Sequence, residues 1–163
     1  MPRRLLRYAG LFLLFILPAF TDAAFAAGTD RQPKDILTGI YKQAVKDNTE
    51  WLDAKHRGQY LSKSLIELWA RAEKKNKDDD EGALIDFDLT TDTNGLELAD
   101  FVIAVKSQSE TAAVLAVKLI YREPYVHKGP PKVVTYDFIR EGGSWRVDNM
   151  RGLEWSLRDI LKP

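Results

Sequence analysis

The chain has 163 residues, a formal net charge of zero and no cysteine. This length predicts one domain, and the balanced charge lacks the basic excess typical of nucleic-acid-binding proteins. The lack of cysteine excludes disulfides, thiolate catalysis, cysteine-containing metal sites and a lipid anchor carried on a cysteine.

The beginning of the chain has the three parts of a secretory signal peptide. Three arginines precede an apolar run from Tyr8 to Phe20, and small residues occupy the −3 and −1 positions of a cleavage site after Ala26. The apolar run of about 13 residues is shorter than the roughly 20 needed to span a bilayer. We therefore predict a signal peptide (1–26), a flexible leader (27–32) and a single domain (33–163). The protein is then periplasmic or secreted, and it meets the membrane only during export.

Two amphipathic helices are predicted in the first half of the domain. Between Pro33 and Asn48, apolar residues recur at the three-and-four spacing of one helical face. A second stripe of this kind runs roughly from Gln59 to Lys75, and Ser62 or Ser64 is placed to cap its start. The stretch from Asn48 to Gly58 is predicted to be a connector or a short helix.

Alternating apolar residues predict strands in the second half of the chain. Ala83 to Leu89 shows a short alternation, and Leu98 to Ser107 and Ala112 to Arg122 show longer ones. The connection between the two longer runs is short and polar, as antiparallel neighbours require. Ser156 to Leu161 is predicted to close the chain as a short helix or capped turn.

A β-hairpin is predicted from Val133 to Asn149. Its two β-rich runs flank Gly142 and Gly143, and both central residues of a type I′ turn need the positive φ that glycine adopts without steric cost. After the turn, Trp145 and Val147 share one face of the strand. The hairpin therefore fixes a bulky apolar face in register.

Helices that precede a run of antiparallel strands indicate an α+β architecture. We predict N-terminal helices packed on a curved antiparallel sheet of about four strands. This packing is expected to bury Trp69, Phe101, Leu115 and Trp145 together. The sheet is expected to form a half-open cone, and cones of this kind contain a pocket.

Three segments carry a family resemblance, from Leu84 to Asp88, from Gly143 to Asn149 and from Ser156 to Leu161. Their sequences, LIDFD, GSWRVDN and SLRDIL, resemble a bacterial family of exported domains of unknown function. That family is similar in fold to nuclear transport factor 2 and to cystatins. The resemblance covers about Lys34 to Leu161, and the chain departs from it at Leu89, where the family has proline. It implies a cone-like fold that hosts isomerases, dehydratases, transport adaptors and binding modules, so it does not select an activity.

Asp86, Asp148 and Tyr136 are the candidate catalytic residues. If the last strand lies beside the short strand that contains Asp86 and Asp88, these carboxylates meet at the mouth of the cone. Clustered carboxylates raise one another's pKa, which tunes a general acid or base. Tyr136 would then stabilise a developing oxyanion, as in isomerases. The alternative is that the aspartates cap turns and pair with nearby arginines.

Asp88, Trp51 and Trp155 are the candidate ligand-binding residues. Trp51 and Trp155 lie in less regular segments, so they are predicted at a pocket rim or a partner surface. Trp69 and Trp145 fall on apolar faces, and core packing explains them.

No metal or other cofactor is predicted. His56 and His127 are far apart in the sequence, and the chain has no His-x-x-x-His pair of the kind that binds zinc. The acidic stretch from Asp78 to Asp100 lacks the first and last ligands of an EF-hand loop. We interpret the histidines as surface residues and the acidic stretch as a solvated loop.

The predicted function is an exported, non-catalytic binding module for an unknown small ligand or an envelope protein. One alternative is a small pocket enzyme (isomerase, lyase or hydrolase) that uses Asp148 or Asp86 with Tyr136 as acid and base. Another is an inhibitor or immunity-type protein that presents the acidic residues Asp78 to Glu81. No nucleic-acid partner is predicted.

Overall fold

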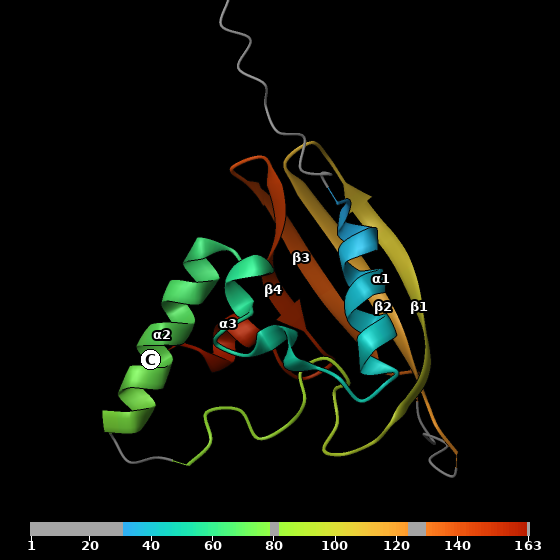
Figure 1. The fold of residues 1–163 in the computed structure, drawn as a ribbon, viewed down its shortest axis with the longest axis horizontal. Helices are drawn as coiled ribbons and strands as arrows, with labels where there is room; N and C mark the ends of the chain where they lie inside the picture. Colours follow the sequence, from blue (N-terminus) through green and yellow to red (C-terminus); the bar gives the residue numbers. More distant parts are fainter. Residues whose placement is uncertain (1–30, 79–81, 124–129, 163) are drawn as a thin grey trace, which may run out of the picture.

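The computed structural model describes residues 31–78, 82–123 and 130–162. They form helices beside a four-stranded antiparallel sheet, which confirms the α+β architecture (Figure 1). In chain order the elements are α1 (Pro33–Ala44), the 3₁₀ turns η1 (Glu50–Leu52) and η2 (Arg57–Gln59), α2 (Lys63–Asp78), β1 (Leu98–Gln108), β2 (Ala112–Tyr121), β3 (Val133–Glu141), β4 (Ser144–Arg151) and α3 (Leu157–Ile160). Among the described residues, no helix has both the length and the apolar character needed to cross a membrane. The predicted signal peptide lies outside the described residues.

Helix α1 packs against β1 and β2 (Figure 1). Pro33 stands in its first turn, where the missing N–H costs nothing. Most of the predicted apolar stripe is buried: Ile36, Leu37, Ile40, Tyr41 and Ala44. Its last member, Val45, follows the helix and is half-buried. The helix ends at Ala44 rather than at Asn48, because Asp47 takes a left-handed conformation (φ 58°) that a helix cannot continue through.

Helix α2 begins at Lys63, four residues later than predicted, because Gln59 belongs to η2. Ser62 provides the cap: its hydroxyl accepts a hydrogen bond from the backbone N–H of Leu65 at 3.1 Å. That bond satisfies one of the N–H groups that a helix start leaves free. Of the two serines proposed as caps, Ser62 is therefore confirmed in this role.

The four strands pair in sequence order, β1-β2-β3-β4. The outer edge of β4 is covered by the extended segment before α2: Val147 donates its N–H to Tyr60 O at 2.8 Å, and Ser62 donates to Val147 O at 2.9 Å. At the other edge, β1 pairs with β2 through a ladder whose register shifts twice, between Leu98 and Asp100 and between Val105 and Ser107.

The short strand predicted from Ala83 to Leu89 is wrong. This segment is irregular, and its one ladder contact is the isolated bridge between Asp88 and Thr93. The alternation arises because Ile85, Phe87 and Leu89 contact the core from a loop. The segment also has no place beside β4, because the residues before α2 occupy that edge.

The hairpin formed by β3 and β4 is confirmed. Gly142 and Gly143 both have positive φ, at 56° and 81°, as a type I′ turn requires. Trp145 and Val147 are buried. The turn therefore aligns the apolar face of β4 with that of β3.

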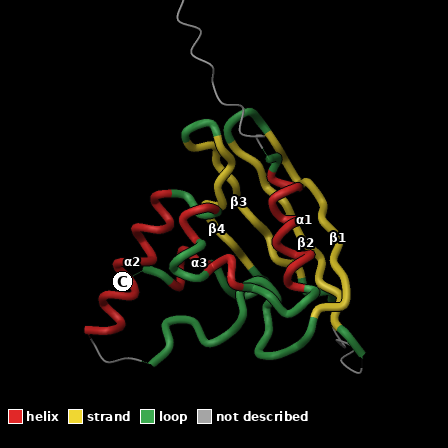
Figure 2. The backbone as a smooth tube through the Cα atoms, viewed as in Figure 1, coloured by secondary structure: helices red, strands yellow, loops and turns green. Residues whose placement is uncertain are grey.

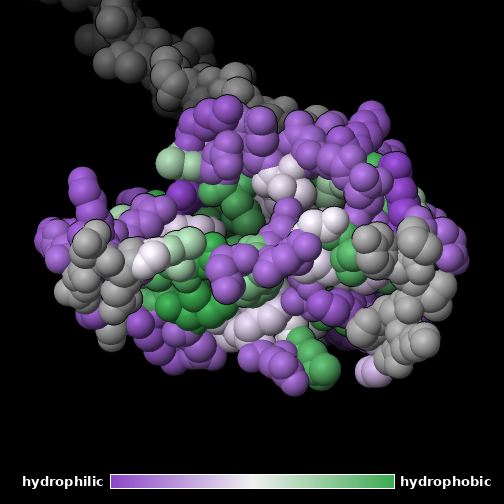
Figure 3. Space-filling view, turned by 90° about the horizontal axis from the view of Figure 1, so that it is seen from below, coloured by the Kyte–Doolittle hydropathy of each residue, from purple (hydrophilic) through white to green (hydrophobic). Residues whose placement is uncertain are grey.

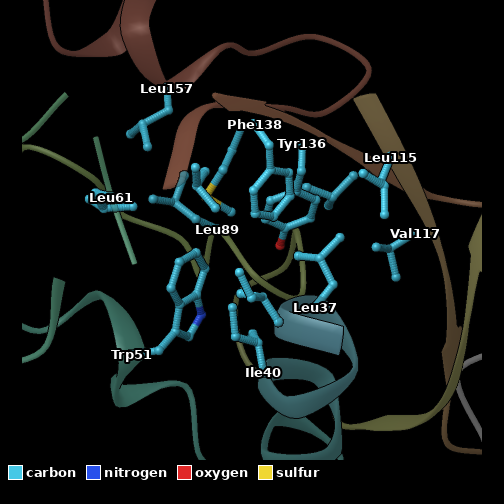
Figure 4. Packing of buried hydrophobic residues seen from close by; sticks show 14 of the residues in the cluster. Leu37, Ile40, Trp51, Leu61, Leu89, Leu115, Val117, Tyr136, Phe138 and Leu157 are labelled. Carbon is cyan, nitrogen blue, oxygen red and sulfur yellow. The ribbon is translucent and has the colours of Figure 1, made fainter. Parts of the chain in front are cut away.

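The core lies between the sheet and the helices, and residues 82–97, which lead into β1, run along the lower end of the fold (Figure 2). In Figure 4, Leu37 and Ile40 of α1 point toward Tyr136 and Phe138 of β3. The four residues predicted to pack together meet in this core: Trp69, Leu115 and Trp145 are buried members, and Phe101 is partly buried against them.

We expect Gly143→Ala to lower the free energy of unfolding by about 1–2 kcal/mol, because a β-carbon is strained in the left-handed region. The matched control is Gly39→Ala in α1, where a β-carbon meets no atom within 4 Å. That change should be neutral or stabilise the protein by up to about 1 kcal/mol, since alanine favours a helix. Urea unfolding checks both values. Equal effects at the two glycines would contradict the turn assignment.

Candidate functional site

Tyr136 lies inside the core on β3 with no exposed surface. Its hydroxyl is 2.8 Å from the hydroxyl of Tyr41, which in turn donates to the carbonyl oxygen of Thr90 at 2.9 Å. A hydroxyl has only one proton to donate. Tyr41 donates its hydrogen bond to the Thr90 carbonyl, so Tyr136 is the donor in the bond between the two tyrosines. Both groups are thus engaged within the core.

Burial raises the pKa of both tyrosines well above the ordinary value. For Tyr136 the nearby charge of Asp88 raises the pKa further. Both hydroxyls therefore stay protonated, and neither lines any of the pockets described below. This placement gives no support to an oxyanion role for Tyr136.

Asp148 of β4 is the centre of a polar cluster that joins the sheet to two helices. Its Oδ1 accepts hydrogen bonds from Ser62 Oγ at 2.6 Å and Ser64 Oγ at 3.1 Å, and from Arg158 Nη2 at 2.5 Å. Partial burial by itself would raise the pKa of Asp148, but the bonds from Ser62, Arg158 and Ser64 outweigh it and lower the pKa. The carboxylate therefore stays ionised and anchors α2 and α3 to β4.

The other two aspartates occupy different surroundings. Asp86 is exposed. Asp88 caps a turn, because its Oδ1 accepts from the backbone N–H of Thr90 at 2.6 Å and of Thr91 at 3.0 Å. The catalytic candidates Asp86, Asp148 and Tyr136 are thus not brought into one site.

The Trp155 pocket is a cavity of about 520 Å³ where β3 begins and the β4–α3 connection passes. Its lining consists of Asp92, Pro130, Pro131, Lys132, Val133, Thr135, Gly152, Leu153, Glu154 and Trp155. Leu153 is 85% exposed and Val133 is 38% exposed. In Figure 3, which views the molecule from the end where the loops gather, hydrophobic residues come to the surface among hydrophilic ones.

Asp92 holds the Trp155 pocket together. Its Oδ1 accepts the indole N–H of Trp155 at 2.6 Å, and its Oδ2 is 3.5 Å from Lys132 Nζ. Phe87 packs edge-on against the Trp155 ring with the ring centroids 5.3 Å apart. Gly152 allows the indole to lie against the backbone, because a β-carbon there would be 2.1 Å from Trp155 Nε1. The indole is therefore fixed on several sides.

The Trp51 pocket is smaller, about 270 Å³, and lies between α1 and the 3₁₀ turns. Its lining consists of Gly39, Ile40, Gln43, Asn48, Glu50, Trp51, His56, Gln59 and Tyr60. Trp51 donates its indole N–H to Thr90 Oγ1 at 2.9 Å and packs edge-on against Tyr60, with 5.6 Å between ring centroids. The pocket lining thus combines the aromatic rings of Trp51 and Tyr60 with mostly polar residues.

The three predicted ligand-binding residues all line pockets, but not the same one. Trp155 and Trp51 line the two pockets just described, and Asp88 lines two smaller hollows of about 210 and 160 Å³. Sequence reasoning missed Asp92, which it interpreted as part of a solvated acidic loop, whereas its side chain is only 13% exposed. It also missed Leu153 and Lys132. Apolar Pro130, Pro131 and Leu153 in loop positions were the available signal.

No protein-family model matches the chain, and no curated protein matches it with significant similarity. The resemblance to an exported family therefore stays a prediction.

The direction of the tyrosine hydrogen bonds predicts unequal costs of removing them. Tyr41→Phe removes the donor to Thr90 and also leaves the Tyr136 proton without its acceptor, so the free energy of unfolding should fall by about 2–3 kcal/mol. Tyr136→Phe removes a single donor and should cost about 1 kcal/mol. Urea unfolding of the two variants measures this difference. A larger cost for Tyr136→Phe would reverse the assigned direction.

Asp148→Asn should lower the free energy of unfolding by about 1–3 kcal/mol near neutral pH, because charge-assisted hydrogen bonds are lost. The folded-state pKa of Asp148 lies below the usual 3.8. The stabilisation is therefore full above that usual value and is lost as the pH falls through the folded-state pKa.

The difference between the wild type and Asp148→Asn should thus shrink in urea unfolding when the pH is lowered from about 7 to about 2.5. Asp86→Asn, at an exposed aspartate, is the matched control and should change stability by less than about 0.5 kcal/mol. A difference for Asp148→Asn that stays constant across this range would show that the ionised carboxylate is not its source.

Proposed function

We propose that this protein is an exported, non-catalytic binding module, and that the Trp155 pocket receives its ligand. The observation that carries the proposal is the combination of exposed apolar side chains with a fixed pair of opposite charges in one cavity. Leu153 and Val133 present apolar surface to solvent, and Asp92 and Lys132 lie beside them. Exposed apolar surface next to positioned polar groups is typical of a ligand site.

The proposed fold class is the cone-like one of nuclear transport factor 2 and cystatins. Support comes from four antiparallel strands in sequence order with an N-terminal helix packed on β1 and β2. The export proposal rests on the signal-peptide pattern in residues 1–26.

The ligand is proposed to have a flat apolar body and a polar group at one end. Pro130, Pro131 and Leu153 with the Trp155 ring form the apolar walls, against which a ring can stack. The Asp92–Lys132 pair lies at the polar side. The volume of about 520 Å³ falls within the range of about 300–1,000 Å³ of small-molecule sites.

A binding role fits the pocket chemistry better than an acid–base role. The Asp92 carboxylate accepts the Trp155 N–H at 2.6 Å and pairs with Lys132, so it serves as a fixed anion that organises the walls. A general base would instead need its lone pairs directed at a substrate proton.

NMR spectra of the protein with added small aromatic amines and aromatic acids test this proposal. A ligand should shift the indole N–H signal of Trp155 and leave that of Trp51 in place. Leu153→Ser should weaken its binding about tenfold, or about 1.4 kcal/mol. Because Leu153 is 85% exposed, this change should leave the fold intact.

The matched control is Val105→Ser, at an exposed apolar residue of β1 that does not line the pocket. It should bind the same ligand as tightly as the wild type. The proposal is overturned if no compound of either class moves the Trp155 signal, or if Leu153→Ser binds as well as Val105→Ser.

A further inference from the structure

Glu50, Asp53 and His56 come together on one side of the turn that begins with η1. Two successive turns bring them close: η1 ends at Leu52, and Asp53 (ψ 149°) leaves the 3₁₀ helix and begins the next turn. Asp53 N donates to Glu50 O at 3.0 Å, and His56 N donates to Asp53 O at 2.8 Å. As a result, one carboxylate oxygen of each acid and one ring nitrogen of His56 all lie within 4.8 Å of one another.

One ring nitrogen of His56 is held by a backbone carbonyl. Its Nδ1 is 3.0 Å from the carbonyl oxygen of Glu50. A carbonyl only accepts, so the neutral imidazole carries its proton on Nδ1 and keeps a lone pair on Nε2. Histidines that bind metals usually donate their second nitrogen in this way, which fixes both the ring and the tautomer.

Arg57 anchors the turn that carries these residues. Its guanidinium donates to Leu52 O at 3.1 Å and to Glu73 Oε1 at 2.9 Å, and it lies 4.3 Å from the centre of the Trp69 ring. A turn held to α2 in this way can present ligands in a fixed arrangement.

The cluster also opens onto a cavity. Glu50 and His56 line the Trp51 pocket, together with Gln43 and Asn48. A metal held by three protein ligands keeps a further position for water or an exogenous ligand, and this pocket of about 270 Å³ has room for one. The competing contact is weak, because Lys55 Nζ is 3.7 Å from Glu50 Oε2 and both side chains are more than half exposed.

We propose that Glu50, Asp53 and His56 bind a divalent transition-metal ion, with zinc as the best match, and leave one coordination position facing the Trp51 pocket. Imidazole with carboxylates suits zinc, whereas calcium and magnesium prefer oxygen ligands alone. This site is separate from the Trp155 pocket, and its test does not depend on the proposed function.

The test is a calorimetric titration of zinc chloride into the tag-free chain that begins at residue 27. We expect one zinc ion per chain. His56→Ala and Asp53→Asn should each weaken binding about tenfold or more. The matched controls are Glu67→Gln, at an exposed glutamate of α2, and His127→Ala, at the only other histidine. Both should bind zinc like the wild type.

A variant that binds zinc more tightly than the wild type must be folded, so one such variant is included. Lys55→Gln removes the cation that pairs with Glu50, so it should bind zinc more tightly than the wild type. The proposal is overturned if the wild type binds no zinc, if His56→Ala leaves the affinity unchanged, or if calcium chloride displaces zinc at equal concentration.

Discussion

The hydrogen bonds that converge on Thr90 connect four parts of the chain. Its carbonyl oxygen accepts from Tyr41 of α1, its hydroxyl accepts from Trp51 of η1, and its N–H donates to Asp88. Tyr136 of β3 joins through Tyr41. Thr90 is fully buried, so each of these bonds forms in a low-dielectric interior where an unpaired group is costly. The helix, the 3₁₀ turns, the loop and the sheet are therefore fixed relative to one another by polar contacts as well as by apolar packing.

Regular elements could be predicted from the sequence because their periodicity and turn residues are local. The two glycines at 142 and 143 and the buried face of Trp145 on β4 are examples. The Thr90 network could not be predicted, since its partners lie 39 and 49 residues away in the chain. The segment from Ala83 to Leu89 misled the strand prediction, because alternation records which side chains reach the core and does not require a ladder. Only the packing of the surrounding segments distinguishes a strand from a loop whose side chains reach the core.

The surroundings of the candidate site residues could not be predicted for the same reason, because their partners are distant in the sequence. Asp148 stood out in the sequence as a carboxylate on the last strand of the hairpin. Its three hydrogen-bond donors, however, are Ser62, Ser64 and Arg158. These residues surround it only after α2 and α3 pack on β4. Trp155 lines a pocket, and a tryptophan in an irregular segment has no strand or helix face to bury it. Its anchor, Asp92, lies 63 residues earlier and looked like one acidic residue among many.

The two edges of the sheet differ in a way that bears on self-association. Strand β4 is covered along part of its edge by the segment before α2, whereas β1 is the other end strand. An open strand of this length is a template for pairing with a second chain. Here the register shifts at Leu98/Asp100 and at Val105/Ser107 interrupt its ladder, and bulges of this kind twist an edge away from a flat partner. Exposed Val102 on β1 therefore lies on a strand whose irregular ladder disfavours edge-to-edge pairing with a second chain.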